Sequence, residues 1–214
     1  IPQWDNQMSF QASRQRYLRE FNNVKVFYKN LHNAALHYRT ENDTVEHEVA
    51  LASSSALQQY IIKAPRSKEV NMRFDPYDSL HVYGVIFESG PGVYVDNFSM
   101  RGNSGIGLRM IEDNIFRQFN SYRDYKLVLL QYGLNAVQAD SLIYRSYTDR
   151  MIKTVNKLKR LYPNASFVLM SVSDRGSNVT GEFKTMREIP ALVNAQREIA
   201  QATQIVFWNL YEAM

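Results

Sequence analysis

The pattern of hydrophobic and polar positions divides the chain into two parts. Between residues 21 and 95, short runs rich in β-branched and aromatic residues are separated by turn-forming residues. Such a pattern is typical of an antiparallel sandwich of the jelly-roll kind. The expected strands are 24–28, 35–39, 45–51, 57–62, 70–74, 80–87 and 93–95, with the second and third forming a hairpin about the turn 41–43. Residues 1–20 have a weaker pattern and are expected to form a loop followed by a short helix or an entry strand.

After residue 95, apolar runs alternate with segments of helical period. The runs are short and unbroken, which is typical of strands buried on both faces of a parallel sheet. Three strands (127–131, 166–170, 205–208) and three helices (108–119, 140–162, 190–202) are expected, with a polar loop at 174–182. Pro190 suits the first turn of its helix. The alternation predicts an α/β domain over residues 96–214.

Composition removes several classes of function. The 214 residues contain no cysteine, which excludes disulfides, thiolate nucleophiles and cysteine metal sites. The net charge of +4 comes from scattered basic residues rather than a dense stripe, which argues against a nucleic-acid partner. No apolar run approaches the ~20 residues that span a bilayer. The four histidines are too dispersed for a metal site, and no cofactor is expected.

The first candidate for chemistry is the glycine-rich segment 101–107, Arg-Gly-Asn-Ser-Gly-Ile-Gly, which precedes a predicted helix. Such a turn presents backbone N–H groups that suit a negative charge. It departs from the dinucleotide fingerprint, and a nucleophile elbow around Ser104 would require glycine where Ile106 stands. Two interpretations remain open, a donor loop for an oxyanion and a tight turn that needs positive φ. Arg101 would meet an anionic substrate or lie on the surface.

The second candidate is Gly133-Leu134-Asn135, at the end of the expected strand 127–131. The amide of Asn135 either donates a hydrogen bond to developing charge or caps the following helix. Consecutive strand ends of a parallel sheet lie side by side, so a backbone N–H near Gly105 is expected beside Asn135. Asp174 follows the strand 166–170, where it would line the same site or form an ion pair within its loop.

The order of glycine loop, helix, apolar strand, Gly-x-Asn, long helix and strand resembles the SGNH/GDSL family of esterases and acylhydrolases over residues 93–214. The resemblance implies a three-layer, flavodoxin-like parallel sheet and an oxyanion hole. Gly105, with Gly102 as the alternative, matches the family's second-block glycine. Asn135 matches the third-block asparagine and Gly133 its glycine, although Ala136 stands where the family usually has Asp or Glu.

Two blocks of that family are missing from the chain, because neither Gly-Asp-Ser nor Asp-x-x-His occurs and every histidine precedes residue 96. The resemblance therefore implies a parent with the nucleophilic serine upstream of Ile1 and the histidine base downstream of Met214. Residues 21–95 would then be an insert between the first and second blocks. The chain alone is expected to be inactive.

This layout is similar to SGNH proteins of Bacteroidetes type, which implies export to the periplasm or cell surface and an acylated carbohydrate, peptidoglycan or small ester as substrate. Two other functions stay open: a non-catalytic carbohydrate-binding or scaffold protein, and a nucleotide binder that uses residues 102–107. An incomplete sheet exposes a strand edge, which favours a homo-oligomer.

Overall fold

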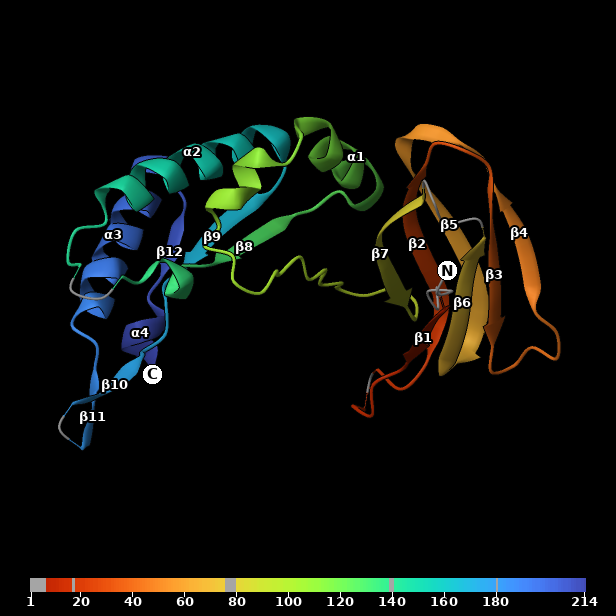
Figure 1. Cartoon of the computed structure of the whole chain (residues 1–214), viewed down its shortest axis with the longest axis horizontal. Helices are drawn as coiled ribbons and strands as arrows, with labels where there is room; N and C mark the ends of the chain where they lie inside the picture. Colours follow the sequence, from red (N-terminus) through yellow and green to blue (C-terminus); the bar gives the residue numbers. More distant parts are fainter. Residues whose placement is uncertain (1–6, 17, 76–79, 139–140, 180) are drawn as a thin grey trace, which may run out of the picture. The chain divides into compact units, whose positions relative to one another are not determined.

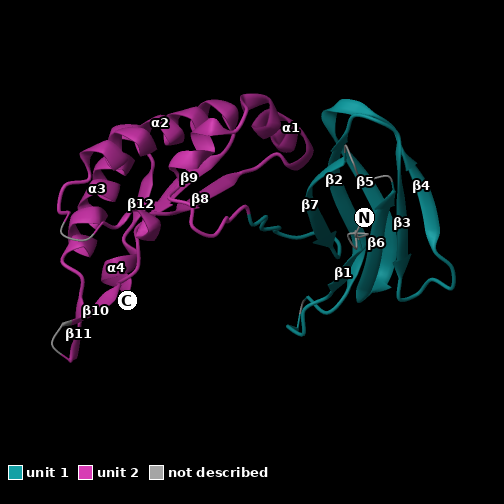
Figure 2. Cartoon of the chain, in the orientation of Figure 1, with its two compact units in different colours: residues 1–97 teal, residues 98–214 magenta. Residues whose placement is uncertain are grey.

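The computed structural model describes residues 7–16, 18–75, 80–138, 141–179 and 181–214. The chain divides into two compact units, Ile1–Asn97 and Phe98–Met214, which Figure 2 colours separately. Figure 1 shows that strands make up the first unit, whereas strands and helices make up the second.

The first unit consists of two antiparallel sheets that share one core. One sheet has the order β1-β6-β3-β4 and the other β5-β2-β7. Apolar residues at every second position face the core, as Val70, Met72 and Phe74 do on β6. The expected hairpin is confirmed, since β3 and β4 pair in antiparallel register from Ala34 to Tyr38. The strands are β1 (Gln7–Gln11), β2 (Phe21–Asn30), β3 (Ala34–Thr40), β4 (His47–Leu51), β5 (Ser54–Ser67), β6 (Glu69–Asp75) and β7 (Leu80–Glu88).

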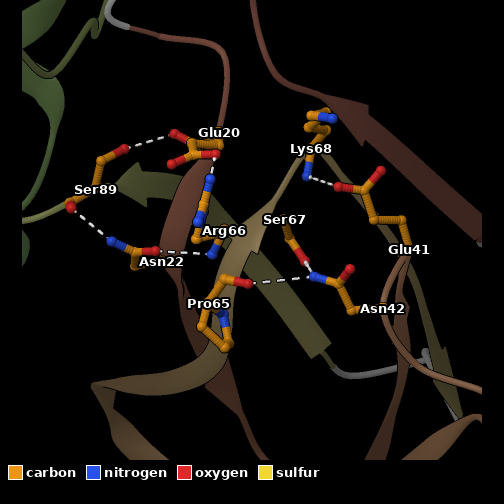
Figure 3. Close-up of polar contacts among 9 residues, drawn as sticks. All are labelled: Glu20, Asn22, Glu41, Asn42, Pro65, Arg66, Ser67, Lys68 and Ser89. Atoms are coloured by element: carbon orange, nitrogen blue, oxygen red, sulfur yellow. Dashed lines mark hydrogen bonds and ion pairs between the residues drawn. The ribbon is translucent and has the colours of Figure 1, made fainter.

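β5 extends beyond the expected end at residue 62 and passes through Pro65. The strand lies at the edge of its sheet, where a proline without an N–H group is tolerated. The side chain of Asn22 supports this stretch, because it accepts from the Arg66 N–H at 2.8 Å and donates to the Ser89 carbonyl at 2.6 Å (Figure 3). The pairing with β2 is irregular here.

The expected strand 93–95 is absent from the structure, and that prediction was wrong. Val93 is 96% exposed and Val95 is 89% exposed. Their β propensity has no effect here, because strand propensity depends on packing against neighbouring strands. Of the two elements expected within residues 1–20, a short helix or an entry strand, the structure contains the strand, β1.

The second unit is built on a three-stranded parallel sheet with the order β12-β9-β8. The helices α2 and α3 pack on one face of it, around Leu130, Met151, Leu169 and Leu192. The predicted α/β alternation with a parallel sheet is confirmed. The elements are η1 (Ile106–Met110), α1 (Asp113–Arg123), β8 (Leu127–Gln131), η2 (Leu134–Ala136), α2 (Arg145–Leu161), β9 (Ser166–Met170), β10 (Gly176–Val179), β11 (Glu182–Thr185), α3 (Glu188–Thr203), β12 (Val206–Trp208) and α4 (Leu210–Ala213).

The opposite face of this sheet is largely exposed in the described part of the chain. Leu127 and Leu129 on β8 are 59% and 51% exposed, and Val206 and Trp208 on β12 are 61% and 50% exposed. The sequence predicted strands buried on both faces and three layers, whereas the described residues form two. Alternate residues of β8 explain the difference, since both sets are apolar but only Val128 and Leu130 pack on the helices.

Two further elements differ from expectation. The single helix expected at 108–119 is two helices, η1 and α1, separated at Ile111, whose backbone is extended. The polar loop expected at 174–182 contains a hairpin, in which β10 and β11 pair in antiparallel register. The residues of β11 are all exposed, so no hydrophobic alternation signals a strand there.

Lys157 on α2 forms hydrogen bonds and an ion pair with the segment that joins η1 to α1. Its Nζ donates to the carbonyl of Arg109 at 2.9 Å and to that of Ile111, and it lies 3.1 Å from an Asp113 carboxylate oxygen. The hydrogen bond from Lys157 lowers the pKa of Asp113 below its usual value, and Arg160 adds to this effect. One ammonium group thus satisfies two carbonyls at the C-terminal end of η1, where helix carbonyls lack partners within the helix.

Replacing Lys157 by methionine is expected to lower the free energy of unfolding of the second unit, and the loss should shrink at acid pH. A carboxyl whose folded pKa is lowered stabilises above its unfolded pKa and loses that contribution as the pH falls through its folded pKa. Urea unfolding, followed by the fluorescence of Trp208 in a Trp4→Phe background, measures this at neutral and acid pH. The control is Lys153→Met, an exposed lysine of the same helix. An equal loss at both pH values would show that the ion pair with Asp113 contributes nothing.

Candidate functional site

The candidate site lies beyond the carboxyl end of β8, where the segment 101–107 meets the turn η2. β8 pairs with β9 and occupies one edge of the sheet. Residues at the carboxyl ends of parallel strands gather on one side of a sheet, which is where ligands bind in open α/β folds. The site therefore stands at the outer strand of the sheet rather than at its centre.

Gly105 and Asn135 both bond to Asn103. The Gly105 N–H donates to the side-chain oxygen of Asn103 at 2.7 Å, and the Asn135 side-chain amide donates to the main-chain oxygen of Asn103 at 3.0 Å. Two donors from separate loops are thereby brought to one residue. Their use as an oxyanion hole remains a prediction.

Asn135 keeps a donor for another group. Its amide carries two N–H bonds, and in the described part of the chain one of them has a partner, the Asn103 carbonyl. The side chain is exposed. The turn that carries it is closed by a 2.7 Å hydrogen bond from the Ala136 N–H to the Gly133 carbonyl. Asn135 is therefore held in place at its base while its amide faces solvent.

The two glycines of the site are required by backbone geometry and by space. Gly105 has a φ of 87° and Gly133 a φ of 127°, values that L residues rarely adopt. A Cβ at Gly105 would lie 2.8 Å from the ring of Tyr132, and one at Gly133 would lie 2.8 Å from a methyl of Val172. Both loops are thus packed directly against the carboxyl ends of β8 and β9.

The other predicted site residues are less closely connected. Arg101 and Gly102 are exposed, and Gly102 has a positive φ of 80°. Asp174 is also exposed and accepts a hydrogen bond from the Thr185 hydroxyl at 3.0 Å, so it holds the base of the hairpin instead of reaching Asn135. Its neighbour Arg175 reaches the site, because its guanidinium lies 3.5 Å from the Leu134 carbonyl.

Sequence reasoning missed three residues of this region: Asn103, Tyr132 and Gln196. Gln196 is fully buried on α3. Its signal was present, because a glutamine stood among the apolar positions Leu192 and Ile199 of a predicted helix. A polar residue on an apolar helix face must find hydrogen-bond partners.

Two titratable groups packed beneath the site are the phenols of Tyr132 and Tyr147. Burial raises the pKa of Tyr132 and that of Tyr147, and the amide of Gln196 lowers the latter by a smaller amount. No group of three or more acidic or histidine side chains suited to a metal occurs in the described ranges. Within the same ranges, no helix has the length and apolar character needed to span a membrane.

Comparisons with known proteins show what the fold resembles. No family model matches the sequence, and no curated protein matches it either. A peptidoglycan O-acetylesterase structure superposes with a TM-score of 0.60 at 14% identity, covering 90% of this chain and 53% of that one. A family two carbohydrate esterase from Cellvibrio japonicus superposes with a TM-score of 0.34 at 10% identity, covering 96% of this chain and 82% of that one. The first likeness establishes a similar fold, and the chain spans about half the length of that acetylesterase.

Proposed function

We propose that this chain is part of a serine ester hydrolase acting on O-acylated carbohydrate or peptidoglycan. The observation that carries the proposal is the convergence of the Gly105 N–H and the Asn135 amide on Asn103. An oxyanion hole requires fixed donors, from different segments, that reach one small volume. The fold of the peptidoglycan O-acetylesterase, which this chain resembles, supports the substrate class.

In this mechanism a serine Oγ attacks the acyl carbonyl while a histidine takes its proton. The carbonyl electrons move to oxygen, and the free N–H of Asn135 and the N–H of Gly105 donate to that oxyanion. The intermediate collapses, and the leaving alkoxide takes the proton from the histidine. Water then hydrolyses the acyl-enzyme. The Asn103 side-chain oxygen occupies the acceptor position on Gly105 that the oxyanion would take.

The serine and the histidine base would lie outside these 214 residues, because neither family block that carries them occurs in the sequence. The bare sheet supports this arrangement. Among the described strands β8 pairs with β9 alone, so a strand carrying the serine would fit beside β8, next to Asn135. A helix after such a strand would cover Leu127 and Leu129 and complete the third layer. A periplasmic or cell-surface location would suit the substrate.

The 214-residue chain alone is expected to show no turnover of p-nitrophenyl acetate, since its donors act on an intermediate that only a nucleophile creates. The natural polypeptide that includes these residues and their flanking sequence is expected to release acetate from O-acetylated peptidoglycan. The activities of both proteins are measured on p-nitrophenyl acetate and on O-acetylated peptidoglycan. Turnover by the 214-residue chain that Ser104→Ala abolishes would place the nucleophile inside it and contradict the proposal.

A second candidate function, glycan binding without catalysis, is favoured by one feature of the first unit. A depression of about 450 Å³ is lined by polar and charged side chains of Gln11, Ser13, Arg14, Arg19, Glu41, Lys68 and Glu69. The ion pairs found among the described residues do not involve Arg14, Arg19 or Lys68. Retention of the natural polypeptide on peptidoglycan, without any release of acetate, would favour this function over the esterase.

A further inference from the structure

The ends of β8 and β9 are joined by one buried side chain. The Gln196 amide nitrogen donates to the Tyr132 carbonyl at 2.7 Å, and its oxygen accepts from the Val172 N–H at 2.9 Å. Tyr132 follows the last residue of β8, and Val172 lies two residues beyond β9. Gln196 thus connects the two strands where they no longer pair with each other.

The same contacts reach both loops of the candidate site. A Cβ on Gly133 would lie 2.9 Å from the Gln196 amide nitrogen, and one on Gly105 would lie 2.8 Å from the Tyr132 ring. Tyr132 is therefore held by Gln196 through its carbonyl while its ring packs on Gly105. Gly133 rests on the Gln196 amide and begins the turn that carries Asn135.

We infer that Gln196 is a positioning residue that sets the placement of Gly105 and Asn135 relative to each other. This inference rests on the proposed function only for its catalytic consequence. Gln196 is fully buried on α3, so its side chain is fixed by a helix in the core rather than by either loop. Donors on loops need such support, because a displacement of about 1 Å can cost about a hundredfold in rate.

Three variants separate positioning from general stability. Gln196→Met keeps the approximate volume and removes both hydrogen bonds. In Gln196→Glu, the protonated carboxyl keeps both hydrogen bonds, because its O–H donates to the Tyr132 carbonyl and its C=O accepts from the Val172 N–H. Ionisation of the carboxyl removes the donor to Tyr132. Burial raises the pKa of such a carboxyl. The raised pKa values of Tyr132 and Tyr147 keep those phenols neutral while the new carboxyl ionises. The control is Gln201→Glu, an exposed glutamine of the same helix.

The readout is the NMR signals of the Asn135 side-chain amide and of the Gly105 and Gly133 N–H groups, in the 214-residue chain labelled at asparagine and glycine. In Gln196→Met, all three signals are expected to shift at every pH. In Gln196→Glu, they are expected to match the wild type at acid pH and to move towards the methionine variant as the pH rises. Gln201→Glu should leave them unchanged.

Two results would overturn the inference. One is unchanged signals of Asn135 and Gly105 in a folded Gln196→Met protein. The other is global unfolding of both Gln196 variants at every pH, which would give the amide a role in the fold as a whole. Neither result depends on catalysis.

A kinetic arm tests the catalytic consequence in the natural polypeptide with its flanking sequence. Relative to the wild type at the same pH, Gln196→Glu is expected to lower kcat by about tenfold or more at high pH and to approach the wild-type kcat at low pH, with KM nearly unchanged. A wild type without ester hydrolysis would contradict the proposed function and leave the NMR result standing. Loss of kcat in Gln196→Glu that is independent of pH would contradict the positioning role.

Discussion

In the longer polypeptide that the proposed function requires, replacement of Asn135 by alanine is expected to lower kcat for ester hydrolysis about a hundredfold. Removal of one oxyanion donor usually costs about 2.7–4 kcal/mol of transition-state stabilisation. KM should change little, because the oxyanion exists in the transition state and not in the bound ester. Initial rates on p-nitrophenyl acetate and on an O-acetylated glycan measure both constants.

The variant also removes the hydrogen bond to the Asn103 carbonyl, so its effect on folding must be measured separately. That bond is expected to contribute about 1 kcal/mol to the free energy of unfolding, too little to unfold the unit. Asn164→Ala is the matched control, since Asn164 is an exposed asparagine between α2 and β9. An Asn135→Ala protein with unchanged kcat would remove Asn135 from the mechanism.

Replacement of Gly133 by alanine is expected to give the largest loss of stability of any single methyl addition in the second unit. Its φ of 127° places alanine in a strained region, at a cost of about 1–3 kcal/mol. The new methyl would also lie 2.8 Å from Val172 and 2.9 Å from the Gln196 amide, and overpacking adds about 1–3 kcal/mol.

Urea unfolding followed by Trp208 fluorescence, in a Trp4→Phe background, measures this loss. Gly107→Ala is the control, because no positive φ is required there and the nearest contact of a new Cβ would be the Asn103 amide at 3.5 Å. The control should be neutral or slightly stabilising through the unfolded chain. Equal stability of the two variants would show that the turn after β8 relaxes freely around an added methyl group.

Most elements of the fold could be predicted from the sequence, because hydrophobic period depends directly on which faces are buried. Both β8 and β9 span the expected residues. The strand predictions were wrong where the hydrophobic pattern does not report burial. Residues 93–95 are exposed instead of paired in a strand, and the hairpin of β10 and β11 has no buried residue among its described side chains. The end of β5 was predicted too early because a proline stops a central strand but is tolerated in an edge strand, and the sequence does not show that Pro65 lies at an edge.

The candidate site could be predicted only in part. Gly133 and Asn135 are recognisable because they follow an apolar strand, and Gly105 because it lies in a glycine-rich segment before a helix. The contact of Asn135 with Asn103, the close approach of Tyr132 to Gly105 and the bridge formed by Gln196 could not be predicted, since these residues are far apart in the chain. Asp174 follows a strand end as expected, yet its partner is Thr185 of the hairpin.

The sequence by itself determined the two-part organisation, the parallel sheet and the strand end at which Asn135 stands. Each follows from periodicity and from turn-forming residues, which are local properties of the chain. The tertiary structure alone decided that Leu127 and Leu129 lie on an uncovered face and that Asn103 receives both donors. It also decided that Gln196 joins the ends of β8 and β9. The physical reason is that these features depend on contacts between distant segments, whose distances are set only when the helices pack on the sheet.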